Sequence, residues 1–479
     1  MPGRTPRVWL VGSTVLWLMA VVFAVSPSMS GKTPKDKDND KNKKVTLDPI
    51  ANAADKAARG RQIFRFDTFG DQAFWGDTLK LHQAIEGAAL GGVGPGVDPA
   101  TALAVGLKID IDAIPRSVLE QIEKGRVNLK DPAVTLALLQ ENAVVGLTGT
   151  FSGGTLQSVG IQCSFCHSTV DDARPDLCFG RIAPNAGTGC IGHRLDGWPN
   201  RDLNVGAIIA LAPDLAALSS LLGTDAAGVR SVLNSWGPGK FDAELILDGK
   251  AFNPQQITDG VVTRTHVPGA TLIPPAFGLG GVNLHTWTGW GSVPHWNAFV
   301  ATLEMHGVGR FFDSRLNDSG QFPIAAANGF GDLPHISPDD DQVTPKLSDL
   351  QFYQLAIPSP QPRPGSFDPA AAERGDALFS GKAACNNCHT EPLWSDAGWN
   401  MHAPADICID DFQANRAPDR KYRTSPIGAL FTHAKGGFYH DGRFATLNAV
   451  VDHYDTCMKL GLTAGEKRDV VQYLLSLTF

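Results

Sequence analysis

The sequence predicts a mainly α-helical protein with extensive loops, built from two related domains of which the first is enlarged by a long insertion. Three observations predict this fold class: the length of the chain, an internal repeat, and a proline-rich segment between the two copies. The 479 residues exceed one ordinary hydrophobic core, since such cores rarely grow beyond about 250–300 residues. Hydrophobic residues make up 43% and charged residues 19% of the chain, which is a globular composition. Strand signals are weak throughout.

The internal repeat predicts how each domain begins and ends. Residues 59–64 and 374–379 share the form Arg-Gly-x-x-apolar-Phe, and each is expected to open a domain as its first helix. Residues 348–355 and 468–474 share an order of polar and apolar positions, which predicts a closing helix packed against each opening helix.

The domain boundary is expected at a run of prolines, which cannot continue a helix. We therefore predict an N-terminal domain over residues 50–357, a linker over 358–367 and a C-terminal domain over 368–479.

Two short segments have the pattern Cys-x-x-Cys-His. Their cysteines are Cys163 and Cys166 in the first domain, and Cys385 and Cys388 in the second. Two thiols at this spacing lie on one side of a helical turn, where they can add to the two vinyl groups of one haem. The next residue, His167 or His389, then reaches the iron as its proximal ligand. A redox disulfide or half of a zinc site would use the same spacing, but two such motifs in one chain favour two covalent haem c groups.

The expected fold is therefore two cytochrome c-like haem domains. Cys385 follows Gly375 by ten residues, whereas Cys163 follows Gly60 by 103. The first domain thus carries an insertion of roughly ninety residues between its opening helix and its haem turn. Residues 65–160 contain no recognisable chemical motif.

The N-terminus has the pattern of an export signal. Arg4 and Arg7 precede an apolar run over residues 8–25, and small residues follow. Residues 1–30 are expected to be a signal peptide or an uncleaved anchor, and only the anchor would attach the protein to a membrane. Residues 31–49 are rich in Lys, Asp and Asn and should form a disordered tether. A periplasmic or extracellular location is therefore expected.

Four further cysteines lie outside the two motifs, at Cys178, Cys190, Cys408 and Cys457. In an oxidising compartment they could pair as Cys178–Cys190 and Cys408–Cys457, but the sequence does not fix the connectivity. The formal net charge is −8, without a basic stripe carrying interleaved aromatics. Nucleic acid is therefore not expected as a partner.

The C-terminal half resembles the second domain of the bacterial diheme cytochrome c peroxidase and MauG family. The similar segments are residues 388–396 after the haem turn, the turn at 422–426, and the block over 438–454 that contains His-Asp-Gly. Residues 191–201 are similar to the segment that carries the distal histidine of the peroxidases. The long region before the first haem looks more like that of rubber oxygenases.

This resemblance implies candidate ligands on the distal faces of the two irons. Tyr454 falls where MauG-like proteins have an axial tyrosine and peroxidases a methionine. His453, Met458 and His440 are its rivals, with a structural role favoured for His440. For the first iron the resemblance indicates His193, whose alternative is a surface or propionate-bonding histidine.

The segment over residues 287–306 occupies the place in the first domain that the His440 block holds in the second. Glu304 then falls near the distal face of the first haem, where a carboxylate could take a proton from bound peroxide and return it to the leaving oxygen. A glutamate on a solvated helix face is the alternative. Met305 and His306 could also approach the iron. The nearby tryptophans are expected mostly to pack against porphyrin, or to carry oxidising equivalents between the haems: Trp287, Trp290 and Trp296.

A calcium ion between the domains is a further feature of the family. Thr424 and Pro426 match positions whose backbone oxygens bind it, and Asn200 lies near the matching asparagine, with Asn and Arg in transposed order. The arginine that would pair with a haem propionate is missing, so we expect that pairing from Arg423 or Arg443.

Three functions follow from these residues. The favoured one is a peroxidase-like oxidoreductase that passes electrons between two haems and reduces peroxide at the N-terminal haem, supplied by a small redox protein or another electron donor. The second is a pure electron-transfer cytochrome with both irons six-coordinate. The third is an oxygenase-type or MauG-like oxidation of an organic or protein substrate with dioxygen or peroxide, suggested by the insertion and Tyr454.

Overall fold

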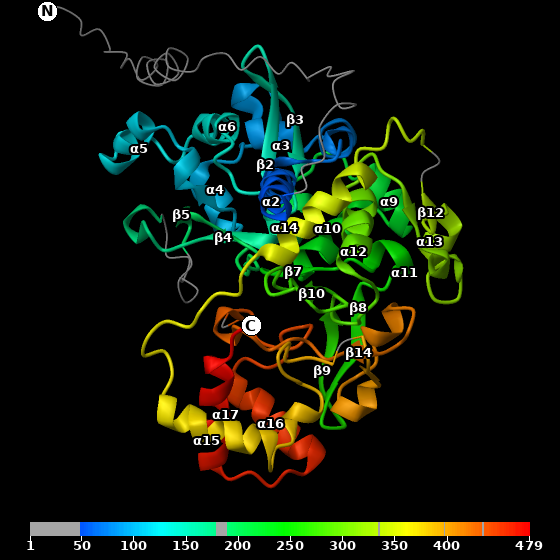
Figure 1. The fold of residues 1–479 in the computed structure, drawn as a ribbon. Helices are drawn as coiled ribbons and strands as arrows, with labels where there is room; N and C mark the ends of the chain where they lie inside the picture. The colour runs from blue at the N-terminus through cyan, green and yellow to red at the C-terminus, as the bar shows by residue number, and fades with distance from the viewer. Residues whose placement is uncertain (1–47, 179–188, 334–335, 397, 434) are drawn as a thin grey trace, which may run out of the picture. The chain divides into compact units, whose positions relative to one another are not determined.

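The computed structural model describes residues 48–178, 189–333, 336–396, 398–433 and 435–479 (Figure 1). The expected leader over residues 1–30, and the expected tether up to residue 47, lie outside the described residues. Within the described part of the chain, no helix combines the length and the apolar character needed to cross a membrane.

The chain divides into two compact units, residues 1–52 and 53–479. Of the first unit the structure describes only residues 48–52, at the start of helix α2. The expected boundary over residues 358–367 lies inside the second unit, so the division into two haem domains stays a prediction.

Helices form most of the regular structure, as expected. Their bounds are α2 Pro49–Phe66, α3 Leu81–Glu86, α4 Pro99–Ala104, α5 Arg116–Glu123, α6 Pro132–Gln140, α7 Ser164–His167, α8 Val205–Ala210, α9 Ala216–Leu222, α10 Ala226–Ser235, α11 Leu245–Asp248, α12 Val293–Phe299, α13 Pro323–Asn328, α14 Leu347–Ala356, α15 Pro369–Ser380, α16 Leu447–Met458 and α17 Ala464–Ser476.

The described strands pair only in twos. Their bounds are β1 Ile109–Asp110, β2 Leu147–Ser152, β3 Thr155–Ile161, β4 Ser168–Val170, β5 Ile191–Gly192, β6 Arg194–Asp196, β7 Lys240–Phe241, β8 Phe252–Thr258, β9 Val261–Pro268, β10 Thr271–Leu272, β11 Phe311–Phe312, β12 Asp332–Leu333, β13 Met401–His402 and β14 Tyr422–Arg423.

Two antiparallel hairpins, β2–β3 and β8–β9, correct the expectation of weak strand structure throughout. Strand β9 is rich in β-branched residues, a composition that favours strands. The hairpin β8–β9 also contacts the C-terminal half, since Asn253 donates a hydrogen bond to Asp410 (2.9 Å) and the Asp259 backbone donates to Cys408 O (2.9 Å).

The C-terminal opening helix packs on the closing helix, as predicted, and α15 and α17 lie side by side (Figure 1). The crossing is tight at Gly375, where a Cβ would lie 2.1 Å from the carbonyl oxygen of Asp469. The Arg374 guanidinium donates two hydrogen bonds to the Asp469 carboxylate, of 2.7 and 2.8 Å. The rings of Phe379 and Tyr473 meet edge to face at 5.2 Å.

The N-terminal opening helix makes the same set of contacts. A Cβ on Gly60 would lie 2.0 Å from the carbonyl oxygen of Asp349 in α14. Arg59 Nε donates to Asp349 Oδ2 (2.5 Å), and Phe64 meets Tyr353 edge to face at 5.6 Å. The repeat seen in the sequence is therefore a repeat of contacts, with glycine required where two backbones approach closely.

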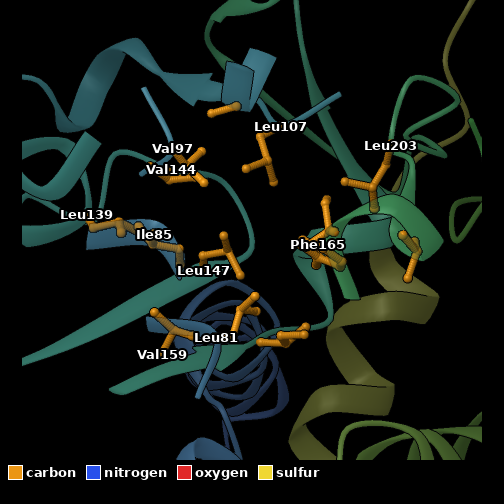
Figure 2. Packing of buried hydrophobic residues seen from close by; sticks show 14 of the residues in the cluster. Leu81, Ile85, Val97, Leu107, Leu139, Val144, Leu147, Val159, Phe165 and Leu203 are labelled. Carbon is orange, nitrogen blue, oxygen red and sulfur yellow. The ribbon is translucent and has the colours of Figure 1, made fainter. Parts of the chain in front are cut away.

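The long insertion builds the core that supports the first Cys-x-x-Cys-His turn. Figure 2 shows how side chains from α3, α6, β2 and β3 pack together with Phe165 of α7, for example Ile85, Leu139, Leu147 and Val159. The turn can approach this core closely because Gly146 has no side chain: a Cβ there would lie 2.1 Å from Phe165 Cα. The insertion thus positions the first site structurally.

The four remaining cysteines form disulfides Cys178–Cys190 and Cys408–Cys457. These are the two pairings that the sequence suggested without fixing them.

A buried ion cluster connects sequence-distant segments of the second unit. Arg416 is 0% exposed, and its guanidinium lies 2.8 Å from Asp242 Oδ1 and 2.9 Å from Asp248 Oδ2. Asp248 ends α11, whereas Arg416 ends the short helix η11, Ala414–Arg416. The charges compensate one another, which is the condition for burying them.

Replacing Gly375 by alanine should destabilise the protein by roughly 1–3 kcal/mol or more, because the new Cβ overpacks a backbone contact. The control is Gly465→Ala in α17, where the nearest atom to a Cβ would lie 3.8 Å away. There, alanine should be neutral or stabilising by up to about 1 kcal/mol through its helix propensity. Urea unfolding compares the two, and equal stabilities would contradict the close helix contact.

Replacing Arg416 by methionine should lower the free energy of unfolding by about 3–5 kcal/mol, because two buried carboxylates lose their counter-charge. Arg374→Met is the matched control: its side chain is 60% exposed, so its loss should change stability little. Thermal unfolding measures both variants. A small loss for Arg416→Met would show that the buried cluster is not compensated by this arginine.

Candidate functional site

The first Cys-x-x-Cys-His turn lines a large cavity of about 300 Å³. Cys163 and Cys166 are free thiols, so the redox-disulfide alternative is not formed here. Burial raises the pKa of each thiol to about 12. Neither thiol belongs to a cluster with metal-ligand spacing among the described residues, and this disfavours the zinc alternative at this turn.

The histidine of this motif is oriented by the backbone. His167 Nδ1 lies 3.1 Å from the carbonyl oxygen of Pro274, an arrangement in which Nδ1 carries the proton and donates it. Burial lowers the pKa of His167 to about 4, so the ring is neutral at physiological pH. The Nε2 lone pair is then available to a metal, and the backbone bond fixes the ring orientation.

The second motif repeats this arrangement. Cys385 and Cys388 are free thiols, and His389 Nδ1 lies 3.1 Å from the carbonyl oxygen of Trp394. Burial lowers the pKa of His389 as well. Trp394 is itself fixed between the rings of Phe379 and Tyr473, at 6.1 and 6.2 Å, and its Nε1 donates to Thr478 O. The opening and closing helices therefore position the proximal histidine.

These residues fit the covalent haem that the motifs predict. Each site offers two thiols outside any disulfide and an imidazole whose Nδ1 faces a backbone carbonyl, and the cavity at the first site is lined mostly by apolar side chains. This is the donor set that a c-type haem requires.

Glu304 lines the same cavity as Cys166 and His167, and its place on the distal face of a haem stays a prediction. It ends a π-helical turn, η6 Val300–Glu304, and such turns are frequent at functional sites. Its Oε1 has no hydrogen-bond partner among the described residues. Burial, and then the negative charge of Glu244, raise the pKa of Glu304 well above its usual value.

Glu244 is a cavity residue that the sequence did not indicate. It lines the same cavity, and burial raises its pKa to about 7. Its local sequence has no distinguishing pattern, because the property that matters is its burial beside other carboxylates, which depends on the folded chain.

Met305 and His306 also line the cavity. His306 stacks on Phe74 with a ring separation of 3.5 Å, and burial lowers its pKa to about 4. Of the three tryptophans, Trp287 and Trp296 line the cavity, whereas Trp290 stacks on Phe322 in a separate core. Packing against porphyrin, expected for most of the three, therefore does not apply to Trp290 and stays a prediction for Trp287 and Trp296.

The structure does not bring His193 to the cavity. Its side chain is 55% exposed and its Nδ1 lies 3.0 Å from Asp112 Oδ1. Asp112 raises the pKa of His193. This corrects the expectation that His193 is an iron ligand. The residue lies between β5 and β6 and its side chain is at the surface beside an exposed carboxylate, so the alternative of a surface histidine holds.

Tyr454 lies near the second pair of thiols. Burial, with Cys385 and Cys388 contributing, raises its pKa to about 12. Its rivals have other roles: the ring nitrogens of His453 lie 2.8 Å from Ile407 O and 2.9 Å from Asp259 Oδ1.

Two further rivals of Tyr454 are also accounted for. Met458 is 46% exposed. His440 stacks on Tyr422 at 5.1 Å, in agreement with the structural role expected for it.

The calcium residues are engaged within the chain. Asn200 Nδ2 donates to Gly106 O (3.0 Å), and the Thr424 carbonyl accepts from Ser395 Oγ (2.7 Å). Pro426 lines a small pocket with Arg423. The calcium site stays a prediction.

One cluster with metal-ligand spacing occurs in the described part of the chain, at Cys388, Asp396 and His402. Its cysteine belongs to the second Cys-x-x-Cys-His motif.

Of the two arginines expected to pair with a propionate, Arg443 is already bound to Asp410 (2.8 Å) and Asp441 (2.9 Å). Arg423 lines the large cavity, and its guanidinium donates to the backbone carbonyls of Thr286 and Leu284. No ion pair joins Arg423 to a described carboxylate, so it is the better candidate of the two.

Comparison with known proteins gives a limited match. No family model matches the chain. It is 30% identical over 107 residues to the methylamine utilization protein MauG of Methylorubrum extorquens, covering 22% of this chain and 28% of that protein. It is 31% identical over 152 residues to the cytochrome-c peroxidase IdrP1 of Denitromonas iodatirespirans, covering 23% of this chain and 40% of that protein. The matches thus span less than half the length of either relative.

A crystal structure of a MauG-like protein associated with microbial copper homeostasis matches at a TM-score of 0.28 and 18% identity, covering 48% of this chain and 78% of that one. A TM-score this low carries no argument. The two sequence matches confirm the resemblance to the MauG and diheme cytochrome c peroxidase family, at low identity and low coverage. The likeness of the N-terminal region to rubber oxygenases stays a prediction.

Proposed function

From this resemblance and the two repeated sites, we propose that the protein is an exported diheme c-type oxidoreductase of peroxidase type. The observation that carries the proposal is Glu304, whose Oε1 lacks a hydrogen-bond partner among the described residues, in the cavity of Cys163, Cys166 and His167. A site for electron transfer alone has no use for an unpartnered carboxyl beside the haem.

The thiols and the proximal histidines hold the cofactors. Cys163 and Cys166 would form the thioether bonds of the first haem, and Cys385 and Cys388 those of the second. When bound, haem supplies an iron that exchanges electrons and can bind a small oxidant. The bonds from His167 to Pro274 and from His389 to Trp394 fix the two imidazoles for this task.

Glu304 handles protons at the first site. Burial, together with the negative charge of Glu244, raises the pKa of Glu304 and so favours the protonated carboxyl, which can donate a proton to the oxygen that leaves peroxide. Glu244 lies in the same cavity with a pKa of about 7 and can take up or release a proton in that range. The mostly apolar lining limits the access of water to these carboxyls.

The two sites differ in a way that suits a division of labour. The first has the carboxyls of Glu304 and Glu244 in its cavity, whereas the second has Asp396 beside Cys388 and Tyr454 near its thiols. We propose that the second haem receives electrons from a small redox protein or another donor and passes them to the first. Export to the periplasm or beyond, and a calcium ion held in part by Thr424 and Pro426, belong to this proposal.

A MauG-like oxidation of an organic or protein substrate is the second candidate, because a tyrosine ligand at Tyr454 would favour the oxidised states of that haem. A pure electron carrier is the third candidate, and the buried carboxyls of the first cavity argue against it.

Optical and EPR spectra of the holoprotein, fully oxidised and half-reduced, test the proposal with and without hydrogen peroxide. A high-spin haem that reacts with peroxide is expected in one of these states. Two low-spin haems that stay inert in both states would identify an electron-transfer cytochrome instead.

Glu304→Gln should slow the reaction with peroxide by roughly 10²–10⁴-fold, because it removes the proton donor and acceptor. The variant should also lose the part of the pH dependence that comes from Glu304. Glu120→Gln, on the exposed surface of α5, is the control. Stopped-flow spectroscopy measures both, and an unchanged rate for Glu304→Gln would exclude this carboxyl from the reaction.

A further inference from the structure

Arg201 is a buried cation without a counter-charge. Its side chain is 2% exposed, and Nε, Nη1 and Nη2 have no hydrogen-bond partner among the described residues. Burial lowers its pKa only to about 10, so the guanidinium stays charged at neutral pH. An unpaired buried charge costs several kcal/mol, which proteins normally offset with an anion.

Arg416 shows how this chain treats a buried guanidinium elsewhere. Arg416 is 0% exposed and lies between Asp242 and Asp248. Arg201 is similarly buried, but it has neither a carboxylate nor another hydrogen-bond acceptor among the described residues. The contrast indicates that the partner of Arg201 is a group other than the described residues.

The charges that face Arg201 are mostly positive. Burial lowers the pKa values of Lys240 and His433, and the charge of Arg201 lowers both further. The carboxylate of Asp202 is already bound by Lys108 (2.6 Å) and by Lys435. His433 is neutral, because its pKa is lowered to about 3, so the cations here are Arg201 and Lys240, and they attract an anion rather than a further cation.

Arg201 lies next to the large cavity. A Cβ on Gly436 would be 3.7 Å from Arg201 Nη1 and 3.1 Å from Leu272 Cδ2. Leu272 lines the cavity of the first Cys-x-x-Cys-His turn, and His433 lines the adjoining small pocket with Arg423. An acidic group of a molecule bound there has only a short distance to reach Arg201.

We propose that Arg201 binds a carboxylate of a covalently held haem, that is, a propionate. This rests on the proposed haem content. A guanidinium binds a carboxylate with two parallel hydrogen bonds, which would satisfy the nitrogens that lack partners. The propionate comes from the haem at Cys163 and Cys166 or from the haem at Cys385 and Cys388.

Redox titration of the holoprotein tests the proposal, with each haem followed by its own EPR signal. Arg201→Met should lower the midpoint potential of one haem, because an uncompensated propionate stabilises the ferric state. That potential should also become dependent on pH, as the freed propionate then titrates at a higher pH. The haem that responds identifies the source of the propionate.

Arg201→Lys keeps the charge, occupies a similar volume and lacks the guanidinium fork. It should leave the potential near that of the wild type while shifting the propionate bending band in the resonance Raman spectrum, and it serves if Arg201→Met does not fold. Arg116→Met, with a side chain that is 94% exposed, controls for the loss of one charge.

Three results would overturn the inference or its premise, and they can be told apart. If both haems are present but Arg201→Met leaves both potentials and their pH dependence unchanged, the propionate assignment is wrong. It is also wrong if added acetate shifts the wild-type potential and not that of Arg201→Met, since the anion then comes from solvent. A purified chain without covalent haem would instead contradict the proposed function itself.

Discussion

The close contact between the opening and closing helices is the constraint on which both sites depend. At Gly60 and Gly375 the two backbones approach so closely that a Cβ would meet a carbonyl oxygen at 2.0 and 2.1 Å. In the C-terminal half, the aromatic contacts of this helix pair fix Trp394, whose carbonyl accepts the hydrogen bond of His389. The orientation of a candidate iron ligand thus follows from the packing of two helices.

In the N-terminal half the helix pair is connected to the site by a different route. Tyr353 of α14 donates a hydrogen bond to Asp196, which also accepts one from Ser168, the residue after His167. Arg65 of α2 forms an ion pair with the same carboxylate (2.6 Å). Asp196 therefore connects the opening helix, the closing helix and the first Cys-x-x-Cys-His turn. About a hundred residues of sequence separate the opening helix from that turn.

Patterns with a local spacing could be predicted from the sequence, and this explains which expectations succeeded. The Arg-Gly repeat predicted which helices pack together, because glycine and its neighbours lie where two backbones approach closely. The Cys-x-x-Cys-His spacing predicted where the two sites are. His193 was misjudged because its neighbours resemble a distal segment, whereas its exposure depends on how β5 and β6 lie. Arg201 and Glu244 could not be found, because neither the missing partners of a guanidinium nor the burial of a carboxyl has a local signature.

The two sites share a histidine whose Nδ1 faces a backbone carbonyl and differ in the side chains around it, and that difference underlies the functional proposal. Glu304 and Glu244 give the first cavity groups that can hold and release protons, whereas Tyr454 lies near the second pair of thiols. Two sites that differ in this way suit the proposal that one haem receives electrons and the other transfers them to an oxidant.

The central claim is that the two Cys-x-x-Cys-His turns each carry one covalent haem. Intact mass spectrometry of the denatured protein, produced in an exporting host with the c-type maturation system, tests it most directly. The account predicts a mass that exceeds that of the processed polypeptide by two haem groups, and by one in either the Cys163→Ala/Cys166→Ala or the Cys385→Ala/Cys388→Ala variant. A wild-type mass without added haem, or a double-alanine variant that keeps the full addition of the wild type, would contradict it.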